Sequence, residues 1–304
     1  MVSIIIPTYN EQNDIESTLD SLHNLSYRNI EIIIVDDSND NTPKIIKGYN
    51  SNLINYIRPI KRGGRCEARN LGIEKSKGEI LIILNADVFL PRDFIGKILV
   101  HYENGYDYVL VDSKVRNDEF LFSRYIDCQH KFLINETSLS KDAMWTEGFS
   151  IKRKILLKTK LFPTGFAIPI VAGEDARLGQ ELKDKGFEKK IDLSIVVEHN
   201  APPKFKEYWK IRKGRGEGTP QIRRFLDKWS HLKIFAFEIL KLNLRILKTI
   251  LVFPFLKECF QYLKYSKSSS KFMEIFRFFY CKVIEEFAAS YGAFKMHLKI
   301  IKNE

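Results

Sequence analysis

Acidic side chains close two apolar runs of the sequence, where they could bind a cation. The run GEILIILNADVFLP, residues 78–91, leads to Asp87, with Asn85 two residues before it. The run EIIIVDDSNDNT leads to Asp36 and Asp37. A partly desolvated acidic cluster costs on the order of several kcal/mol unless a cation or hydrogen-bond donors offset it. Because magnesium and manganese bind carboxylates together with phosphate oxygens in nucleotide enzymes, these acids predict a cation site.

A further acidic pair stands where a helix is predicted to begin. The stretch VAGEDARLGQEL places Glu174 and Asp175 in the first helical turn, where the macrodipole is expected to lower their pKa. Asp175 is therefore a candidate general base, which must be ionised and within reach of an acceptor hydroxyl. Each acid taken alone fits a helix cap or a charged helix start equally well. Their occurrence together favours a functional site.

The elements that would position these acids follow a βαβ pattern. Short β-branched runs alternate with segments of helical period, which predicts parallel strands joined by helices. The carboxyl ends of such strands gather at one edge of the sheet, where open α/β sheets bind ligands. The predicted strands cover residues 2–7, 30–36, 54–59, 80–85, 108–112, 145–151 and 191–199. A helix that ends at Gly186 is predicted before the last of them.

The last third of the chain has a different composition. From residue 201 onward, 22 Lys and Arg stand against 9 Asp and Glu, whereas the first 200 residues hold 27 against 29. Two amphipathic segments, 232–265 and 271–301, are rich in Phe and Tyr and fringed by basic residues, as in helices that lie in a membrane interface. The alternative is that they pack on each other and on the remainder of the chain. The expected domains are 1–225, catalytic, and 226–304, membrane-associating.

The cysteines and the apolar stretches indicate a compartment. The cysteines form no CxxC pair, which favours free thiols in a reducing environment. No secretion signal is expected at the N-terminus. The longest C-terminal apolar stretch, ILKTILVFPFL, is shorter than the ~20 residues that a spanning helix needs. We therefore expect a cytoplasmic protein, peripheral on the cytoplasmic face of the membrane.

Four motifs, in this order, resemble the family 2 glycosyltransferases with the GT-A fold. They are VSIIIPTYNE, EIIIVDDSNDNT, GGRCEARNLGIEKSKGEILIILNADV and GEDARLGQEL, and the resemblance covers about residues 1–215. It implies an α/β, Rossmann-like fold with a central, mostly parallel sheet and helices on both faces. It also implies an inverting transfer from a UDP or GDP sugar, with a divalent metal, Mg or Mn, that bridges the diphosphate.

The resemblance implies roles for individual residues. Asp87 would be the metal ligand of the motif written Asp-x-Asp, and Asp175 would be the catalytic base. His199 matches a position that can also bind the metal, although a surface histidine fits equally well. Asn85 replaces the first aspartate of the motif and could keep a hydrogen bond to the ribose without the charge. The residues expected to bind the nucleotide sugar are Pro7, Thr8, Tyr9, Glu11, Asp36, Asp37, Arg65, Arg69, Asn85 and Ala86.

The basic stretch YWKIRKGRGEG, residues 208–218, is predicted to be a loop that its glycines make mobile. Arg212 and Arg215 would neutralise the departing nucleoside diphosphate as this loop closes. The alternative is a solvated basic linker.

The expected acceptor is lipid-linked, a polyprenyl phosphate or a lipid-linked glycan, at a membrane surface. Three other functions compete with this prediction. A sugar-phosphate nucleotidyltransferase would show a glycine-rich phosphate loop after the first strand, and IIIPTYNE has none. A nucleic-acid-binding protein would explain the basic third but not the acidic strand ends, which repel phosphate, so no nucleic-acid partner is expected. A non-catalytic membrane adaptor on a degenerate transferase fold has Asn85 as its support.

Overall fold

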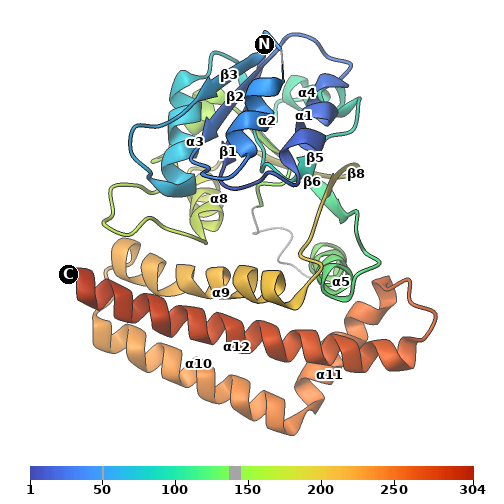
Figure 1. Ribbon diagram of the computed structural model, residues 1–304, viewed down its shortest axis with the longest axis vertical. Helices are drawn as coiled ribbons and strands as arrows, with labels where there is room; N and C mark the ends of the chain where they lie inside the picture. The colour runs from blue at the N-terminus through green and yellow to red at the C-terminus, as the bar shows by residue number, and fades with distance from the viewer. Residues whose placement is uncertain (50, 137–144) are drawn as a thin grey trace. The chain divides into compact units, whose positions relative to one another are not determined.

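Runs of isoleucine and valine form the strands of one sheet, since β-branched side chains favour an extended backbone. The computed structural model describes residues 1–49, 51–136 and 145–304, which contain an eight-stranded sheet in the order β3-β2-β1-β4-β7-β6-β8-β5 (Figure 1). The strands are β1 Val2–Thr8, β2 Ile30–Asp36, β3 Ile54–Ile57, β4 Ile80–Ile83, β5 Val88–Phe89, β6 Tyr108–Val115, β7 Phe149–Lys152 and β8 Lys189–His199.

Strands β1 to β4 run parallel, as the alternating pattern predicts. Strand β1 pairs with β2 and β4, and β2 pairs with β3. Helices α1 (Ile15–His23), α2 (Thr42–Gly48) and α3 (Gly64–Lys75) make the crossovers that parallel strands require. Beyond β4 the sheet is mixed, because β7 is antiparallel to β4 and β6, and β8 is antiparallel to β5. The loops after β1, β2 and β4 therefore emerge at one edge of the sheet.

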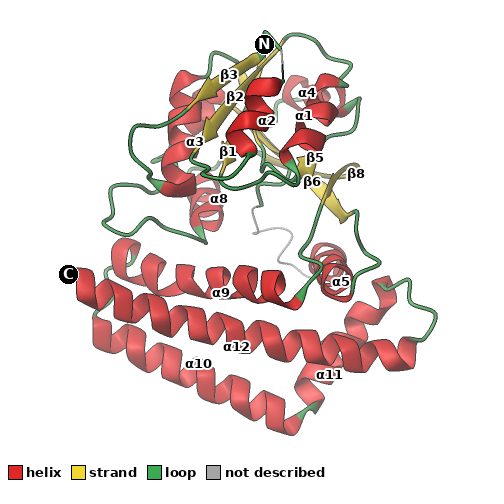
Figure 2. Ribbon diagram, in the orientation of Figure 1, coloured by secondary structure: helices red, strands yellow, loops and turns green. Residues whose placement is uncertain are grey.

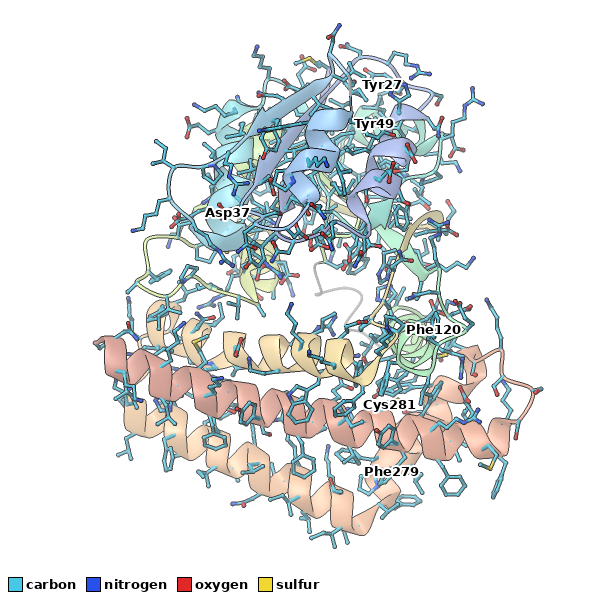
Figure 3. All side chains as sticks on the ribbon, in the orientation of Figure 1. Tyr27, Asp37, Tyr49, Phe120, Phe279 and Cys281 are labelled. Carbon is cyan, nitrogen blue, oxygen red and sulfur yellow. The ribbon has the colours of Figure 1, made fainter. Side chains whose placement is uncertain are left out.

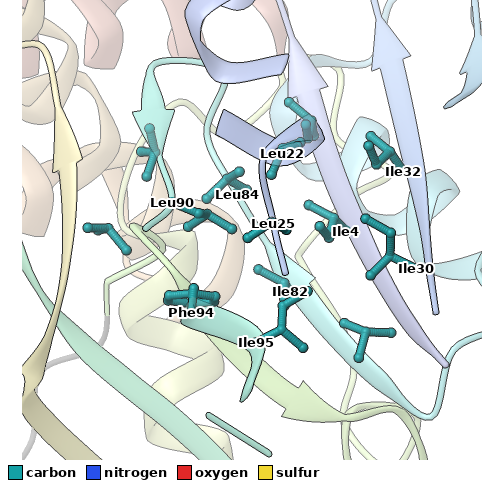
Figure 4. Close-up of a cluster of buried hydrophobic side chains, with 14 of the residues drawn as sticks. Ile4, Leu22, Leu25, Ile30, Ile32, Ile82, Leu84, Leu90, Phe94 and Ile95 are labelled. Carbon is teal, nitrogen blue, oxygen red and sulfur yellow. The ribbon is translucent and has the colours of Figure 1, made fainter. Parts of the chain in front are cut away.

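Alternate residues of these strands are covered by different helices. On one face, β1, β2 and β4 pack with α1 and with α4 (Phe94–Glu103) in the cluster of Figure 4, which includes Ile4, Ile32, Ile82, Leu22 and Phe94. On the other face, Ile33 and Val35 pack with Ala68 of α3. Each buried Ile, Leu or Phe side chain contributes about 1.5–3 kcal/mol. The prediction of helices on both faces is confirmed.

Helices make up most of the remaining described chain (Figure 2). They are α5 Leu121–Glu136, α7 Arg153–Leu156, α8 Glu174–Asp184, α9 Phe205–Gln221, α10 His231–Leu251, α11 Phe253–Tyr262 and α12 Lys271–Asn303, with a π-helical turn Ile222–Leu226 and a 3-10 turn Leu263–Tyr265. The predicted C-terminal amphipathic segments correspond to α10 with α11, and to α12. Within the described helices, none has both the length and the apolar character that crossing a membrane requires.

The described residues divide into two compact units. The sheet unit contains those of 1–114, 143–165 and 174–200, and the helical unit contains those of 115–142, 166–173 and 201–304. This division differs from the expected boundary after residue 225, because α9 packs along α12 and so belongs with the C-terminal helices.

Close contact between α9 and α12 corrects the predicted mobile loop at 208–218, which is helical. A Cβ atom on Gly216 of α9 would lie 2.0 Å from the carbonyl oxygen of Ala289 in α12. A Cβ atom on Gly292 of α12 would lie 2.1 Å from the carbonyl oxygen of Lys213. These glycines allow the two backbones to touch, as small residues do wherever helices pack closely. Gly216, with Gly214 and Gly218 beside it in the sequence, indicates mobility when read along the sequence alone.

Replacing Gly216 with alanine should therefore destabilise the helical unit, because the added methyl group has no space. Overpacking of this kind costs about 1–3 kcal/mol. The matched control is Gly214→Ala on the same helix, where an added Cβ meets no atom within 4 Å. That change should be neutral or stabilising by up to about 1 kcal/mol, since alanine is the better helix former. Urea unfolding midpoints measure both variants, and equal midpoints would contradict the close packing.

Candidate active site

The loops that follow β1 and β2 are joined by hydrogen bonds. The backbone N–H of Asn10 donates to Ser38 Oγ at 2.7 Å. The backbone N–H of Glu11 donates to Thr42 Oγ1 at 2.9 Å. Asn10 takes a positive φ of 58°, a conformation that asparagine tolerates better than most residues. The two loops thus form one connected rim at the carboxyl end of the parallel strands.

The first of these loops carries an exposed aromatic ring. Pro7 and Thr8 are the last residues of β1, and Thr8 is buried. Tyr9 follows with 40% of its surface exposed, and the guanidinium of Arg62 lies 3.8 Å from its ring centroid. A planar ring held beside a cation is suited to stacking against a flat ligand.

The second loop separates two adjacent aspartates into different environments. Asp36 is fully buried and accepts hydrogen bonds from the Tyr56 hydroxyl at 2.8 Å and from Arg58 Nη1 at 3.3 Å. Asp37, labelled in Figure 3, is less buried. Its partial burial raises the pKa of its carboxyl. Since the Asp36 carboxylate is already occupied, Asp37 is the one of the pair that is placed to meet a ligand.

The turn between β4 and β5 holds Asp87 beside His199. The carbonyl of the buried residue Ala86 accepts a hydrogen bond from Thr18 Oγ1 at 2.7 Å, which anchors the turn to α1. Val88 of β5 then pairs with His199 of β8 in antiparallel register. This pairing brings together Asp87, which follows the parallel strand β4, and His199, which ends the antiparallel strand β8.

Negative charge accumulates around Asp87. Burial raises the pKa of Asp87 to about 6, and His199 opposes this rise whereas Glu147 and Asp14 add to it. Burial, followed by the charge of Asp87, raises the pKa of Glu11 to about 8. Burial is the main cause of both shifts, so these carboxylates bind protons more readily than they would in water, and a nearby cation would favour their ionised form. The site is suited to a ligand that brings cationic charge.

Asp87 and His199 fit a divalent cation that shares its coordination with a phosphate. Carboxylate oxygen is an ordinary donor to magnesium and manganese, and imidazole nitrogen is a common ligand of divalent transition metals. Within the described residues, three or more His, Cys, Asp or Glu side chains do not gather as a complete metal site. Magnesium-type sites commonly use one or two protein ligands and fill the other positions with water and substrate phosphate oxygens. The donor set therefore suits a metal that arrives with a diphosphate.

Asp175 occupies the first turn of α8. Its Oδ1 accepts the backbone N–H of Ala176 at 2.8 Å. Burial, followed by the charge of Glu174, raises the pKa of Asp175 to about 6. The expectation that the start of the helix lowers this pKa is wrong, because burial and Glu174 outweigh the N–H bond. A carboxylate with a pKa slightly below neutral suits general base chemistry at physiological pH.

The two arginines predicted near the nucleotide lie in different surroundings. The side chain of Arg65 is 54% exposed, and its Nη1 lies 3.5 Å from Glu174 Oε1. Arg69 is 1% exposed, and its Nη1 lies 2.8 Å from the same oxygen. Arg65 is therefore available to a ligand. The prediction of a direct nucleotide contact for Arg69 conflicts with its burial, since its guanidinium is used inside the protein.

The structure also corrects the roles expected for Arg212 and Arg215. Arg212 is 1% exposed on α9, with its Nη1 2.9 Å from Glu285 Oε1 of α12 and its Nη2 3.0 Å from Gln129 Oε1 of α5. It is thus part of the interior of the helical unit. Arg215 is exposed on the same rigid helix. Neither arginine lies on a mobile loop, because α9 is held against α12.

Sequence patterns assigned no role in the site to Asp14, Thr146 or Glu147. Glu147 precedes Gly148, which has a φ of +76° and lies directly before the first residue of β7. Asp14 accepts a hydrogen bond from Asn200 Nδ2 at 2.6 Å. An acid beside a turn glycine ahead of a strand is the one signal that could have identified Glu147, whereas Asp14 resembles an ordinary helix cap.

Known proteins resemble the chain in both sequence and structure. The family model described as glycosyl transferase family 2 matches residues 3–166. A dolichol-phosphate mannosyltransferase of Pyrococcus furiosus is 27% identical over 177 residues, which are 55% of this chain and 50% of that protein. The GalNAc(5)-diNAcBac-PP-undecaprenol beta-1,3-glucosyltransferase of Campylobacter jejuni is 26% identical over 196 residues, 61% of each chain. The chain thus matches only half to three fifths of the length of these relatives.

Among solved structures, the mannosyltransferase PcManGT from Pyrobaculum calidifontis, in complex with GDP-Man and Mn2+, has a TM-score of 0.56. The match covers 75% of this chain and 64% of that one, at 22% identity. At this identity the likeness concerns the fold. The predicted α/β fold of the GT-A type, with its central sheet, surrounding helices and C-terminal helical region, is confirmed.

Proposed function

The chain belongs to glycosyl transferase family 2, and on this premise we propose that it moves a sugar from a nucleoside-diphosphate sugar to a lipid-linked acceptor at a membrane surface. The observation that carries the proposal is the strand pairing that sets Asp87 beside His199 at the edge of the sheet, with Glu11 close enough for the charge of Asp87 to raise the pKa of its carboxyl. A bound cation with a diphosphate would supply the charge balance that this edge lacks.

In this mechanism the nucleoside lies against Tyr9 and Asp37, the exposed ring and the accessible carboxylate of the rim. Asp87 and His199 hold Mg or Mn, which when bound supplies positive charge to the diphosphate. Asp175 accepts the proton of the acceptor hydroxyl while that oxygen attacks the anomeric carbon from the face opposite the nucleotide. The bond between the anomeric carbon and the diphosphate oxygen breaks as the new bond forms, so the sugar is transferred with a single inversion and the nucleoside diphosphate leaves. Arg65, which remains exposed, adds charge near the departing nucleotide.

The lipid-linked acceptor is supported by the names of relatives, two of which refer to dolichol phosphate and to undecaprenol. An acceptor that is itself a phosphate needs no base, and Asp175 would then position it. The preference between uridine and guanosine donors depends on the rim around Asp37.

The proposal is tested by thermal unfolding with UDP and with GDP, each with and without manganese or magnesium. A ligand that binds only the folded state must raise the melting temperature. We expect one nucleotide to raise it in a metal-dependent manner, after which a panel of sugars on that nucleotide, analysed by mass spectrometry, identifies the donor. No shift with either nucleotide would overturn the proposal and favour the non-catalytic adaptor.

Membrane association is supported by helix α10, which turns charged side chains toward the protein and leucine side chains outward. Two of its charged side chains face inward: Glu238 is 1% exposed, and Arg245 Nε lies 2.6 Å from Glu286 Oε2 of α12. The opposite stripe is apolar and at least half exposed, and it consists of Leu240, Leu244, Leu247 and Leu251. Water is a poor solvent for such a stripe, and exposed apolar patches mark interaction sites.

An anionic lipid surface is the partner we propose for this stripe. Lys248 of α10, which lies between Leu247 and Leu251 in the sequence, and Lys257 of α11 are both exposed. Each basic residue close to an anionic surface contributes about 1 kcal/mol. The four cysteines are free thiols, as in a reducing compartment, which supports the cytoplasmic face.

Replacing Leu244 with glutamate should weaken this association at least tenfold, because a buried leucine contributes roughly 1.5–3 kcal/mol and the new charge is repelled. Co-flotation with vesicles that contain phosphatidylglycerol, at low salt, measures the effect. The control is Val100→Glu on α4, which alters a residue of similar exposure, 51% against 50% for Leu244. Failure of the wild type to float, or equal flotation of the Leu244 variant, would contradict the proposal, and displacement by RNA would favour a nucleic-acid partner.

A further inference from the structure

Arg69 is a buried cation that joins three segments of the candidate site. Its Nη1 donates to Glu174 Oε1 at 2.8 Å. Its Nη2 donates to Thr146 Oγ1 at 3.1 Å and to Asn85 Oδ1 at 3.2 Å. The ring of Phe162 lies 4.9 Å from the guanidinium carbon, so the surroundings of Arg69 leave no route for a ligand to reach its flat face on that side. Helix α3 is thereby tied to the β4–β5 turn and to the first turn of α8.

The charge of Arg69 is already shared by two carboxylates. Glu174 is paired with it directly, and the nearby Arg69 charge also lowers the pKa of Asp175 against the larger effects of burial and Glu174. Arg65, the other cation beside Glu174, is 54% exposed, so an aspartate at position 85 would add a third carboxylate around the buried guanidinium of Arg69, and buried charge without its own partner is costly. An asparagine at this position accepts the same hydrogen bond without adding charge.

The bond from Arg69 also fixes the orientation of the Asn85 amide. Because Oδ1 accepts from the guanidinium, the Nδ2 group points the other way, and it can only donate. Asn85 therefore offers N–H donors to a ligand, whereas an aspartate at the same place could only accept. N–H donors are suited to hydroxyl lone pairs and phosphate oxygens.

We propose that Arg69 is a positioning residue and that Asn85 is matched to it, so that the turn before Asp87 presents an N–H donor to the bound nucleotide. This inference rests on the proposed function for the identity of the ligand, but not for the pairing of the two side chains. Asn85 is then a working part of the site and not a lost aspartate of the Asp-x-Asp motif. Arg69 acts on the ligand through Asn85 and without touching it.

The substitutions Asn85→Asp and Asn85→Ala separate the two interpretations. Titration calorimetry is performed with manganese and whichever of UDP or GDP raises the melting temperature. We expect Asn85→Ala to weaken binding roughly tenfold, the usual cost of one lost hydrogen bond to a charged ligand. Asn85→Asp should weaken it further, since the donor is replaced by an acceptor and a charge is added. Binding by Asn85→Asp that equals or exceeds the wild type would identify a degenerate motif and overturn the proposal.

A ligand-free measurement tests the pairing itself. Melting temperatures are compared for Arg69→Lys, Asn85→Ala and the double variant, with Lys75→Met on the exposed end of α3 as the control. If Arg69 orients Asn85, the second substitution should lower the melting temperature less once the first is present. Additive effects would overturn the pairing whether or not a nucleotide binds, so this result is separate from failure of the proposed function. If Arg69→Lys does not fold, the comparison of Asn85→Asp with Asn85→Ala decides the inference alone.

Discussion

Asp175→Asn should lower the turnover of transfer to an acceptor hydroxyl by about a thousandfold, within the 10²–10⁴ range for loss of a general base. Asparagine keeps the size of the side chain and its hydrogen bond to the Ala176 N–H, but it cannot take a proton. Nucleotide affinity, measured by calorimetry, should stay close to that of the wild type, because Asp175 acts on the acceptor. A turnover that survives would mean that the acceptor is already an anion and that Asp175 positions it.

The pH profile of the wild type provides a second measurement of the same role. Burial and Glu174 raise the pKa of Asp175 to about 6, so the base is protonated below this pH and ionised above it. The turnover should therefore rise with pH through about 6 and level off near neutrality. The residual activity of Asp175→Asn should lack this rise. A profile with the rise unchanged in the variant would assign the titration to another group.

The sheet and the acids at its edge could be predicted because their causes are local. Alternation of β-branched runs with helical segments identifies parallel strands, and parallel strands place the loops at Tyr9, Asp37 and Asp87 together. The pairing of Val88 with His199 is compatible with the resemblance, but the antiparallel register comes from long-range topology. Strand spacing alone contains no information about it.

The errors have the opposite cause, since each depends on a partner distant in the sequence. Read from the sequence, Gly216 indicates a mobile loop, whereas in the structure it lies against the backbone of Ala289 in α12. Read from the sequence, Arg212 is a solvent-exposed cation, whereas in the structure it pairs with Glu285 inside the helical unit. The amphipathic character of 232–265 was predicted, but a periodic pattern cannot say whether charged residues such as Glu238 and Arg245 face water or another helix.

Asp87→Asn should abolish the metal-dependent rise in melting temperature that a nucleotide produces, while the metal-free protein becomes more stable. The first effect follows because the amide has no charge for the cation, and His199 alone is a weak site. At saturating nucleotide, loss of a shift worth about 3 kcal/mol is expected. The second effect follows because burial and the neighbouring acids Glu147 and Asp14 destabilise the ionised carboxylate.

The sign of this stability effect can be checked against pH. The pKa of Asp87 is about 6 in the folded protein and near 3.8 when the chain is unfolded, so the folded state holds its proton more tightly. Stability from this group is present below the unfolded value and is lost as pH rises through 6. The gain in Asp87→Asn, a few degrees of melting temperature, should therefore appear at pH 7.5 and vanish near pH 4.

The matched control is Asp93→Asn in the same unit. Its carboxylate pairs with Lys97 at 2.8 Å, and this bond lowers its pKa, so removing that charge should leave stability unchanged or reduce it. If the melting temperature rises in both variants, removing one negative charge anywhere in the sheet unit is enough to stabilise the protein, and the effect is not specific to Asp87. An increase in Asp87→Asn alone, together with loss of the metal-dependent shift, would mean that the protein tolerates a destabilising carboxylate because the bound cation requires it.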